Sequence, residues 1–157
     1  VHHNQDVLYA VGIHDSQGRL ETATIAYHDK ILMSALVLNQ DLNAPPETVY
    51  LRNVDIHHNS VLSCGAGIGA RGVLINARNV HVHDNHSMDK GGGLLLFKAY
   101  IDKRKDDIQV YNNHAENGAG GLLGYKIKAG EKNQKNIYDN TPNNIEYTEE
   151  ALFRWTE

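Results

Sequence analysis

Residues of metal-binding type recur in this sequence 26 positions apart. Asp55 and His57 are followed by His81 and His83 at that spacing. Two imidazoles and a carboxylate suit zinc or a similar metal if the fold brings them within bonding distance. The other interpretation, which we favour, is a polar outer sheet face on which histidine is tolerated. The four residues remain candidate metal ligands.

The segment Gly67-Ile68-Gly69-Ala70-Arg71-Gly72 matches the pattern G-x-G-x-x-G. In a dinucleotide-binding turn this pattern leads into a helix whose N-terminus holds the pyrophosphate. Here it leads into residues 73–82, which are rich in β-branched residues and end in an alternation typical of a strand. We therefore expect no nucleotide cofactor.

An imperfect repeat of roughly 27 residues organises the chain and would position these side chains. Each copy has two apolar residues separated by one polar residue, which is typical of a half-buried strand. The pairs are Val54/Ile56, Val80/Val82 and Ile108/Val110, with a weaker fourth copy near Ile137. Each copy closes with an asparagine, and these are Asn59, Asn85, Asn113 and Asn140.

Stacking explains why the asparagines recur. Asparagine suits a sharp turn after a strand, because it tolerates left-handed backbone and bonds nearby backbone groups. Stacked one coil above another, the four asparagines can form a ladder of amide hydrogen bonds. A single coil cannot bury its own apolar face, whereas stacked coils can. The sequence therefore predicts an all-β fold, a right-handed parallel β-helix (solenoid) of about three to five coils.

The repeat divides the chain into three predicted parts. Residues 49–147 form the β-helix repeats, and residues 1–48 form an irregular N-terminal coil or cap. Within that cap, residues 31–39 end in Asn39 and are interpreted as an earlier, irregular rung. Residues 148–157 form a short C-terminal helical cap, since Thr148 can cap a helix with acids in its first turn. Two alternatives stay open: a piece of a longer protein or of an end-to-end stack with another chain, or a complete small domain.

The closing motifs resemble those of a known group of proteins. They read Ile56-His57-His58-Asn59, Val82-His83-Asp84-Asn85 and Val110-Tyr111-Asn112-Asn113, with glycine-rich apolar sequence after each. This pattern resembles the repeats of polymorphic outer-membrane and adhesin-like proteins, within the right-handed parallel β-helix proteins that also include the pectate-lyase-like superfamily. The resemblance implies a secreted, extracellular or cell-surface module. We expect it to act as a stiff platform that contacts a polysaccharide or a surface protein.

An enzyme is the alternative that the same resemblance implies. In β-helix polysaccharide lyases and glycoside hydrolases, loops that leave the coils line the substrate groove. A lyase needs a basic residue, usually beside an acidic calcium site, and a hydrolase of this fold uses paired aspartates. Lys105, Asp106 and Asp107 are the candidate catalytic residues in the charged run before the third copy. A charged run is more often a solvated loop, so the binding module is favoured.

Composition excludes other classes. The chain has 157 residues and a net charge of −4, which argues against a nucleic-acid partner. No apolar run approaches the roughly 20 residues of a transmembrane helix, so we expect no transmembrane segment. The one cysteine, Cys64, cannot form an internal disulfide.

Overall fold

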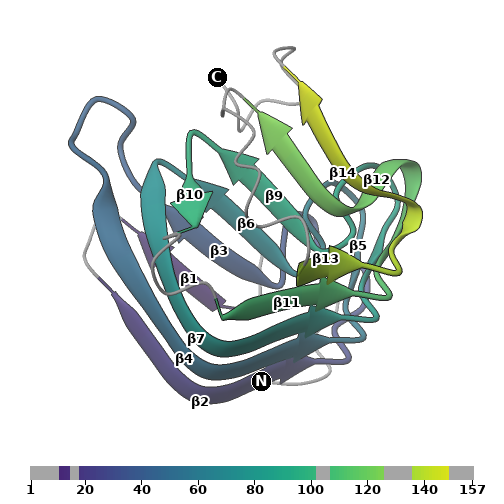
Figure 1. The fold of residues 1–157 in the computed structure, drawn as a ribbon, viewed down its shortest axis with the longest axis horizontal. Helices are drawn as coiled ribbons and strands as arrows, with labels where there is room; N and C mark the ends of the chain where they lie inside the picture. The colour runs from purple at the N-terminus through teal and green to yellow at the C-terminus, as the bar shows by residue number, and fades with distance from the viewer. Residues whose placement is uncertain (1–10, 15–17, 102–106, 126–135, 149–157) are drawn as a thin grey trace.

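The computed structural model describes residues 11–14, 18–101, 107–125 and 136–148. In these parts the chain winds into parallel sheets stacked as a β-solenoid of about five turns (Figure 1). Strands make up 66% of the structure and helix is almost absent, so the predicted all-β parallel β-helix is confirmed.

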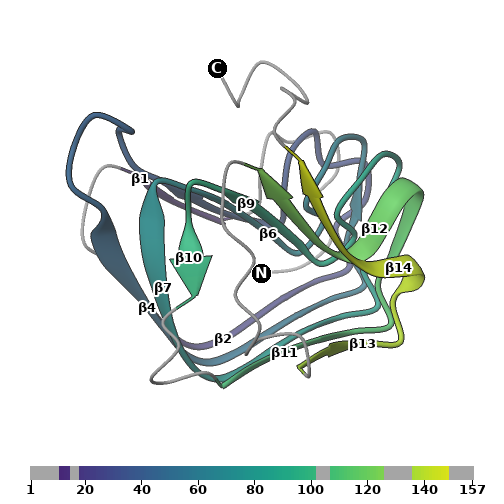
Figure 2. The same ribbon diagram turned by 45° about the horizontal axis from the view of Figure 1, so that its top comes forward.

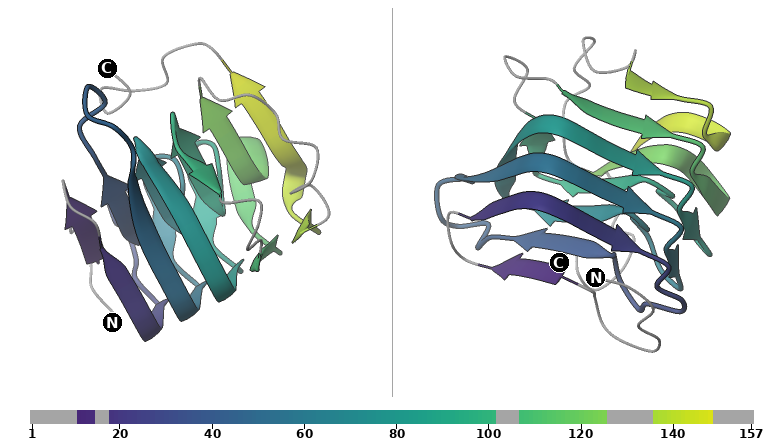
Figure 3. Two further views of the ribbon diagram at one scale, coloured as in Figure 1. Left: turned by 60° about the vertical axis from the view of Figure 1, so that its left-hand side comes forward. Right: turned by 90° about the horizontal axis from the view of Figure 1, so that it is seen from below.

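One sheet holds the long curved strands. Its order is β13-β11-β7-β4-β2, with β10 paired to β7. Figure 3 shows these strands stacked in chain order from purple through teal to green. Their bounds are β2 (Arg19–Ala26), β4 (Glu47–His57), β7 (Val73–His83), β10 (Tyr100–Ile101), β11 (Ile108–Tyr111) and β13 (Ile137–Tyr138).

The second sheet closes each coil. Its order is β1-β3-β6-β9-β12-β8-β5, with β14 paired to β12. The first residues of β12 pair with β8 and its last residues pair with β9, so β12 follows two sides of the coil. Figure 2 shows the two sheets as opposing walls of the solenoid. The bounds are β1 (Val11–His14), β3 (Leu36–Asn39), β5 (Ser60–Val61), β6 (Ile68–Arg71), β8 (His86–Ser87), β9 (Leu94–Phe97), β12 (His114–Tyr125) and β14 (Thr141–Thr148).

Alternation of side chains fixes the register of the first sheet. Ile56 pairs with Val82, and Val82 pairs with Val110, so these buried residues form one inward column. Slipping a strand by one residue would turn this whole set outward, which apolar burial opposes. The core continues across the coil to Leu36, Ile68, Leu94 and Leu122 on the second sheet. The residues between the inward ones consequently point outward in equally regular columns.

The turn after each copy has a left-handed residue, one position earlier than the sequence predicts. In these turns the residues with positive φ are His58, Asp84, Asn112 and Asp139, with φ of 52° to 53°, and Tyr27 with φ of 59°. Each is followed by the buried ladder position. The closing asparagine therefore satisfies the backbone around the turn and does not itself adopt the left-handed conformation.

The four closing asparagines are buried and bonded in a row. The Nδ2 group of Asn59 donates to Oδ1 of Asn85 at 2.9 Å, and Asn85 donates to Asn113 at 3.0 Å. Asn113 donates to Asn140 at 2.9 Å, and Asn140 donates to Asn144 at 3.1 Å. Each Nδ2 also donates to a carbonyl of the preceding coil, for example Ile56 O from Asn85 at 3.0 Å. The ladder thus ties each coil to both neighbours.

The predicted N-terminal cap contributes strands to the same two sheets. Strand β2 pairs in register with β4, and β3 pairs with both β1 and β6. Residues 36–39 of the segment interpreted as an earlier rung form β3, and Asn39 lies there in register with Arg71, outside the ladder column. The ladder column ends instead at His28, whose backbone N–H donates to Oδ1 of Asn59 at 3.2 Å.

The structure shows where two further sequence motifs lie. The G-x-G-x-x-G segment lies in β6 and leads into β7, so no helix follows it that could hold a pyrophosphate. Of the predicted C-terminal cap, Thr148 ends β14 and residues 149–157 lie outside the described residues. Among the described residues, no helix is long and apolar enough to cross a bilayer.

Candidate functional site

A column of stacked rings runs along the outer face of the first sheet. His57, His83, Tyr111 and Tyr138 occupy equivalent positions on four successive strands. Neighbouring ring centroids are 5.1, 4.8 and 5.4 Å apart, and the ring planes differ by 12°, 2° and 8°. Parallel in-register pairing causes this arrangement, because equivalent side chains repeat at the strand spacing of about 4.8 Å. We refer to these four residues as the ring column.

Polar groups flank the ring column. The Nε2 atom of His83 lies 2.9 Å from Oδ1 of Asp55, and its Nδ1 atom lies 2.6 Å from Oδ2 of Asp84. A protonated His83 can therefore donate from both ring nitrogens to carboxylates. At the far end of the column, the hydroxyl of Tyr138 donates to Oε1 of Gln109 at 3.0 Å. The column thus offers ring edges beside hydrogen-bonding groups.

The pKa of His57 is shifted by its surroundings in the ring column. Partial burial lowers its pKa below the ordinary value of 6.5, and the positive charges of His83 and His58 act in the same direction. Asp55 and Asp84 oppose this effect. The Nδ1 atoms of His57 and His58 lie 2.8 Å apart, so one donates a hydrogen bond and the other accepts it. A neutral His57 fits this contact, because it leaves one unprotonated ring nitrogen.

The four predicted metal ligands are only partly brought together. His83 bonds Asp55 and His57 stacks on His83, as just described. His81 instead directs Nε2 to the Oδ1 atom of Asn79, at 3.3 Å. Because both nitrogens of His83 face carboxylates, a metal there would have to displace an existing hydrogen bond. Zinc or a similar metal at Asp55, His57, His81 and His83 stays a prediction, as does calcium beside the charged run.

Of the three predicted catalytic residues, the structure describes Asp107. Lys105 and Asp106 lie outside the described residues. The carboxylate of Asp107 accepts a hydrogen bond from the backbone N–H of Asn79 at 2.8 Å. Asn79 has a φ of +53°, at the bend of β7. Asp107 thus has a structural partner in the bend, and catalysis by this segment stays a prediction.

A second polar cluster, which sequence reasoning missed, lies directly after the ladder. The Nε2 atom of His86 lies 2.6 Å from Oε1 of Glu116, and that of His114 lies 3.4 Å from the same oxygen. The two imidazole rings are 5.2 Å apart. We call these three residues the corner cluster. The signal in the sequence was the position after each closing asparagine, where His86 and His114 stand in equivalent places.

Hydrogen bonding also affects the carboxylate of the corner cluster. The bond from His86 lowers the pKa of Glu116, and His114 acts in the same direction. Glu116 is consequently ionised at neutral pH, beside two imidazoles. A carboxylate and two imidazoles that meet on one surface can share protons or a metal ion.

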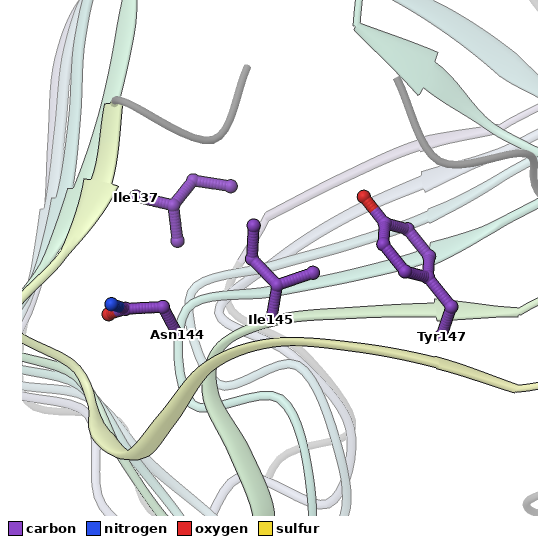
Figure 4. A pocket seen from close by; sticks show the side chains of 4 residues that line it. All are labelled: Ile137, Asn144, Ile145 and Tyr147. Atoms are coloured by element: carbon purple, nitrogen blue, oxygen red, sulfur yellow. The ribbon is translucent and has the colours of Figure 1, made fainter. Parts of the chain in front are cut away.

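A pocket lies on the last coil. Its volume is about 410 Å³, and it is lined by Ile137, Asn144, Ile145 and Tyr147 from β13 and β14 (Figure 4). Figure 4 shows the side chains of Ile137, Ile145 and Tyr147 projecting into the same space. Burial raises the pKa of Tyr147, so its hydroxyl stays protonated well above neutral pH. A C-terminal cap or a second chain would cover this coil, and both stay predictions.

Comparison with known proteins assigns this chain to no family. No protein-family model, no curated protein and no solved structure gives a significant match to this chain.

Proposed function

We propose that the chain is a rigid binding module, and that the ring column is the face with which it contacts an extended polysaccharide. The observation that carries this proposal is the unbroken stack of four rings, spaced by 4.8 to 5.4 Å across successive coils. A repeating surface of this kind suits a repeating ligand, because each sugar unit would meet a similar set of groups.

The ring column would bind through edges and polar neighbours. Inside the stack each ring covers the face of the next, so the faces of His83 and Tyr111 are not open to a sugar. The Tyr138 hydroxyl and the Asp55 carboxylate, which each keep oxygen lone pairs beyond the hydrogen bonds described above, are the groups that could bond sugar hydroxyls. The in-register sheet beneath holds these groups in place, so binding would require little ordering of the protein.

A secreted or cell-surface location is part of the same proposal. It rests on the resemblance of the closing motifs to polymorphic outer-membrane, adhesin-like and pectate-lyase-like β-helix proteins. A platform that binds a polysaccharide without cleaving it would be useful on such a surface. A surface protein is the alternative ligand, and a lyase or glycoside hydrolase is the alternative activity.

The test measures binding and chain length together. The protein is presented to a panel of neutral and acidic polysaccharides, with and without calcium, by affinity electrophoresis and by size analysis of the products. Replacing Tyr111 with alanine should weaken binding at least tenfold. Tyr100→Ala is the matched control, because Tyr100 is 45% exposed on β10, away from the ring column.

Three results would count against the proposal. Equal affinity of the Tyr111→Ala and Tyr100→Ala proteins would show that the polysaccharide binds to a face other than the ring column. Absence of binding to every polysaccharide would favour a protein ligand. Shortening of any polysaccharide would favour the enzyme and direct mutagenesis to Lys105, Asp106 and Asp107.

A further inference from the structure

We propose that the corner cluster, His86, His114 and Glu116, is a zinc-binding site. This inference goes beyond polysaccharide binding and uses a different side of the coil. It is also distinct from the metal ligands that the sequence predicts. One ligand atom from each of the three residues lies within 4.8 Å of the other two.

The ladder positions the two histidines. His86 and His114 directly follow Asn85 and Asn113, and they pair in register on β8 and β12. The backbone N–H of His86 donates to the carbonyl of Asn59 at 2.8 Å, and that of His114 donates to the carbonyl of Asn85 at 2.8 Å. Both Cα atoms are thereby held to the buried framework. Stacking of adjacent coils consequently places one imidazole beside the other.

Glu116 completes the set from the same strand as His114. It lies two residues further along β12, and alternate residues of a strand point to the same side. Its carboxylate already contacts both Nε2 atoms, at 2.6 and 3.4 Å. A zinc ion between the three residues would replace the proton that His86 and Glu116 share. Metal binding in general releases such protons, because the ligands must be deprotonated.

Thr141 orients one of the ligands. The Nδ1 atom of His114 lies 2.8 Å from the hydroxyl oxygen of Thr141, on the neighbouring strand β14. If Nδ1–H donates to this oxygen, the lone pair of Nε2 faces Glu116. Metal-binding histidines almost always donate their other ring N–H in this way, which fixes the tautomer and the ring orientation.

The required movement is small. Zinc bonds to nitrogen and oxygen are about 2.0 to 2.2 Å long, so tetrahedral ligand atoms are about 3.4 Å apart. The His114–Glu116 contact is 3.4 Å, whereas the His86–Glu116 contact of 2.6 Å would have to lengthen. The three side chains are 43% to 49% exposed, so rotation meets little packing resistance.

The ligand types select the ion. Imidazole nitrogen suits zinc, copper or nickel, whereas calcium and magnesium prefer shells of oxygen atoms. Two histidines and one carboxylate leave a fourth zinc position for water or for a group from a bound partner. The ring column is less suitable, because both nitrogens of His83 are engaged by Asp55 and Asp84.

The experiment is titration of the full chain with zinc chloride by calorimetry in a buffer that does not chelate metals. One zinc per chain is expected, with a Kd below about 100 μM. His86→Ala, His114→Ala and Glu116→Gln should each weaken binding at least tenfold. Calcium chloride should give no binding at the same concentrations. Circular dichroism of each variant verifies that the solenoid stays folded.

Two controls separate this site from other histidines. His83→Ala removes the central predicted ligand of the ring column, and it should leave zinc affinity unchanged. The double variant His2→Ala/His3→Ala should also bind zinc with unchanged affinity. His2 and His3 lie outside the described part of the chain. The proposal is overturned if wild-type protein binds no zinc. It is equally overturned if the corner variants bind like wild type, or if either control loses binding.

Discussion

The side chain of Asn85 bonds to that of Asn113 on the next coil, with Nδ2 donating to Oδ1 at 3.0 Å. The same Oδ1 atom of Asn113 also accepts the backbone N–H of Asn85, at 3.0 Å. One asparagine oxygen therefore satisfies two buried donors of the preceding coil. This relationship repeats from Asn59 to Asn140, so the ladder links every pair of consecutive repeats.

Replacing Asn85 with alanine should destabilise the fold by about 3 kcal/mol. It removes the acceptor of the buried backbone N–H of Asn59, one of the acceptors of the Asn59 Nδ2 group, and the Nδ2 donor to the carbonyl of Ile56. Each such loss costs about 1 to 3 kcal/mol. The measurement is urea unfolding followed by circular dichroism. Asn117→Ala is the control, because Asn117 is exposed on β12. Equal unfolding midpoints for the two variants would contradict the structural role of the ladder.

The repeat was predictable because two physical requirements leave marks in the sequence. Burial of one strand face imposes the alternation around Val54 and Ile56, and the buried turn imposes an asparagine at Asn59 and Asn85. The first coil has no asparagine at the ladder position. His28 stands in its ladder position, where its backbone N–H donates to Oδ1 of Asn59. Asn39, the asparagine that ends residues 31–39, lies on β3 of the other sheet.

The corner cluster was harder to predict for a related reason. His86 and His114 are equivalent positions, but Glu116 has no acidic counterpart: Leu62 and Met88 stand at the same distance from the preceding ladder asparagines. The sequence therefore gave no periodic signal for the carboxylate. The outward columns of Asp55 and His57 did carry a periodic signal. Their side-chain directions still depended on local partners such as Asn79 and Asp84, which periodicity does not reveal.

Gly93→Ala should destabilise the solenoid by about 2 kcal/mol, in the range for overpacking a core. A Cβ atom at this position would lie 2.5 Å from Cγ1 of Val110 and 2.8 Å from the carbonyl oxygen of Gly121. Neither a buried valine nor a backbone carbonyl can move away easily. The melting temperature by calorimetry measures the effect.

The matched control for that substitution is Gly118→Ala. A Cβ there would meet Cγ of Lys90 at 2.8 Å and Oε2 of Glu146 at 2.9 Å, which belong to long side chains that can rotate. We expect a much smaller change in melting temperature. A larger loss at Gly118 than at Gly93 would show that close approach of the coils does not decide which glycines are required.

Cys64 should be unreactive in the folded protein. Burial raises the pKa of its thiol to about 12, and the nearby Asp89 carboxylate acts in the same direction. The nucleophilic thiolate is therefore scarce at neutral pH. Ellman's reagent should label less than a tenth of the chains within an hour, and all of them in guanidinium chloride. Rapid labelling of the native protein would mean that the coil around Cys64 opens readily.

The stability of the protein should fall as the pH drops below the ordinary histidine value of 6.5, and His57 should contribute to this fall. Its folded pKa is lowered, chiefly by burial, so between the folded and unfolded pKa values the unfolded chain binds more protons. The free energy of unfolding consequently increases with pH across that window and becomes constant above it. Asp55 and Asp84 weaken the effect, whereas His83 and His58 strengthen it.

His57→Tyr tests that contribution, since the ring column already holds tyrosine at two equivalent positions, Tyr111 and Tyr138. Tyrosine does not titrate near pH 6, so the variant should show a shallower decrease in the free energy of unfolding between pH 7 and about pH 5. Urea unfolding at intervals of half a pH unit measures both proteins. At pH 8 the ring at position 57 is neutral in both proteins, so the difference between their free energies of unfolding there gives the packing effect of the substitution alone. Curves that stay parallel from pH 8 to pH 5 would show that His57 titrates alike in the folded and unfolded chains, against the effect of its burial.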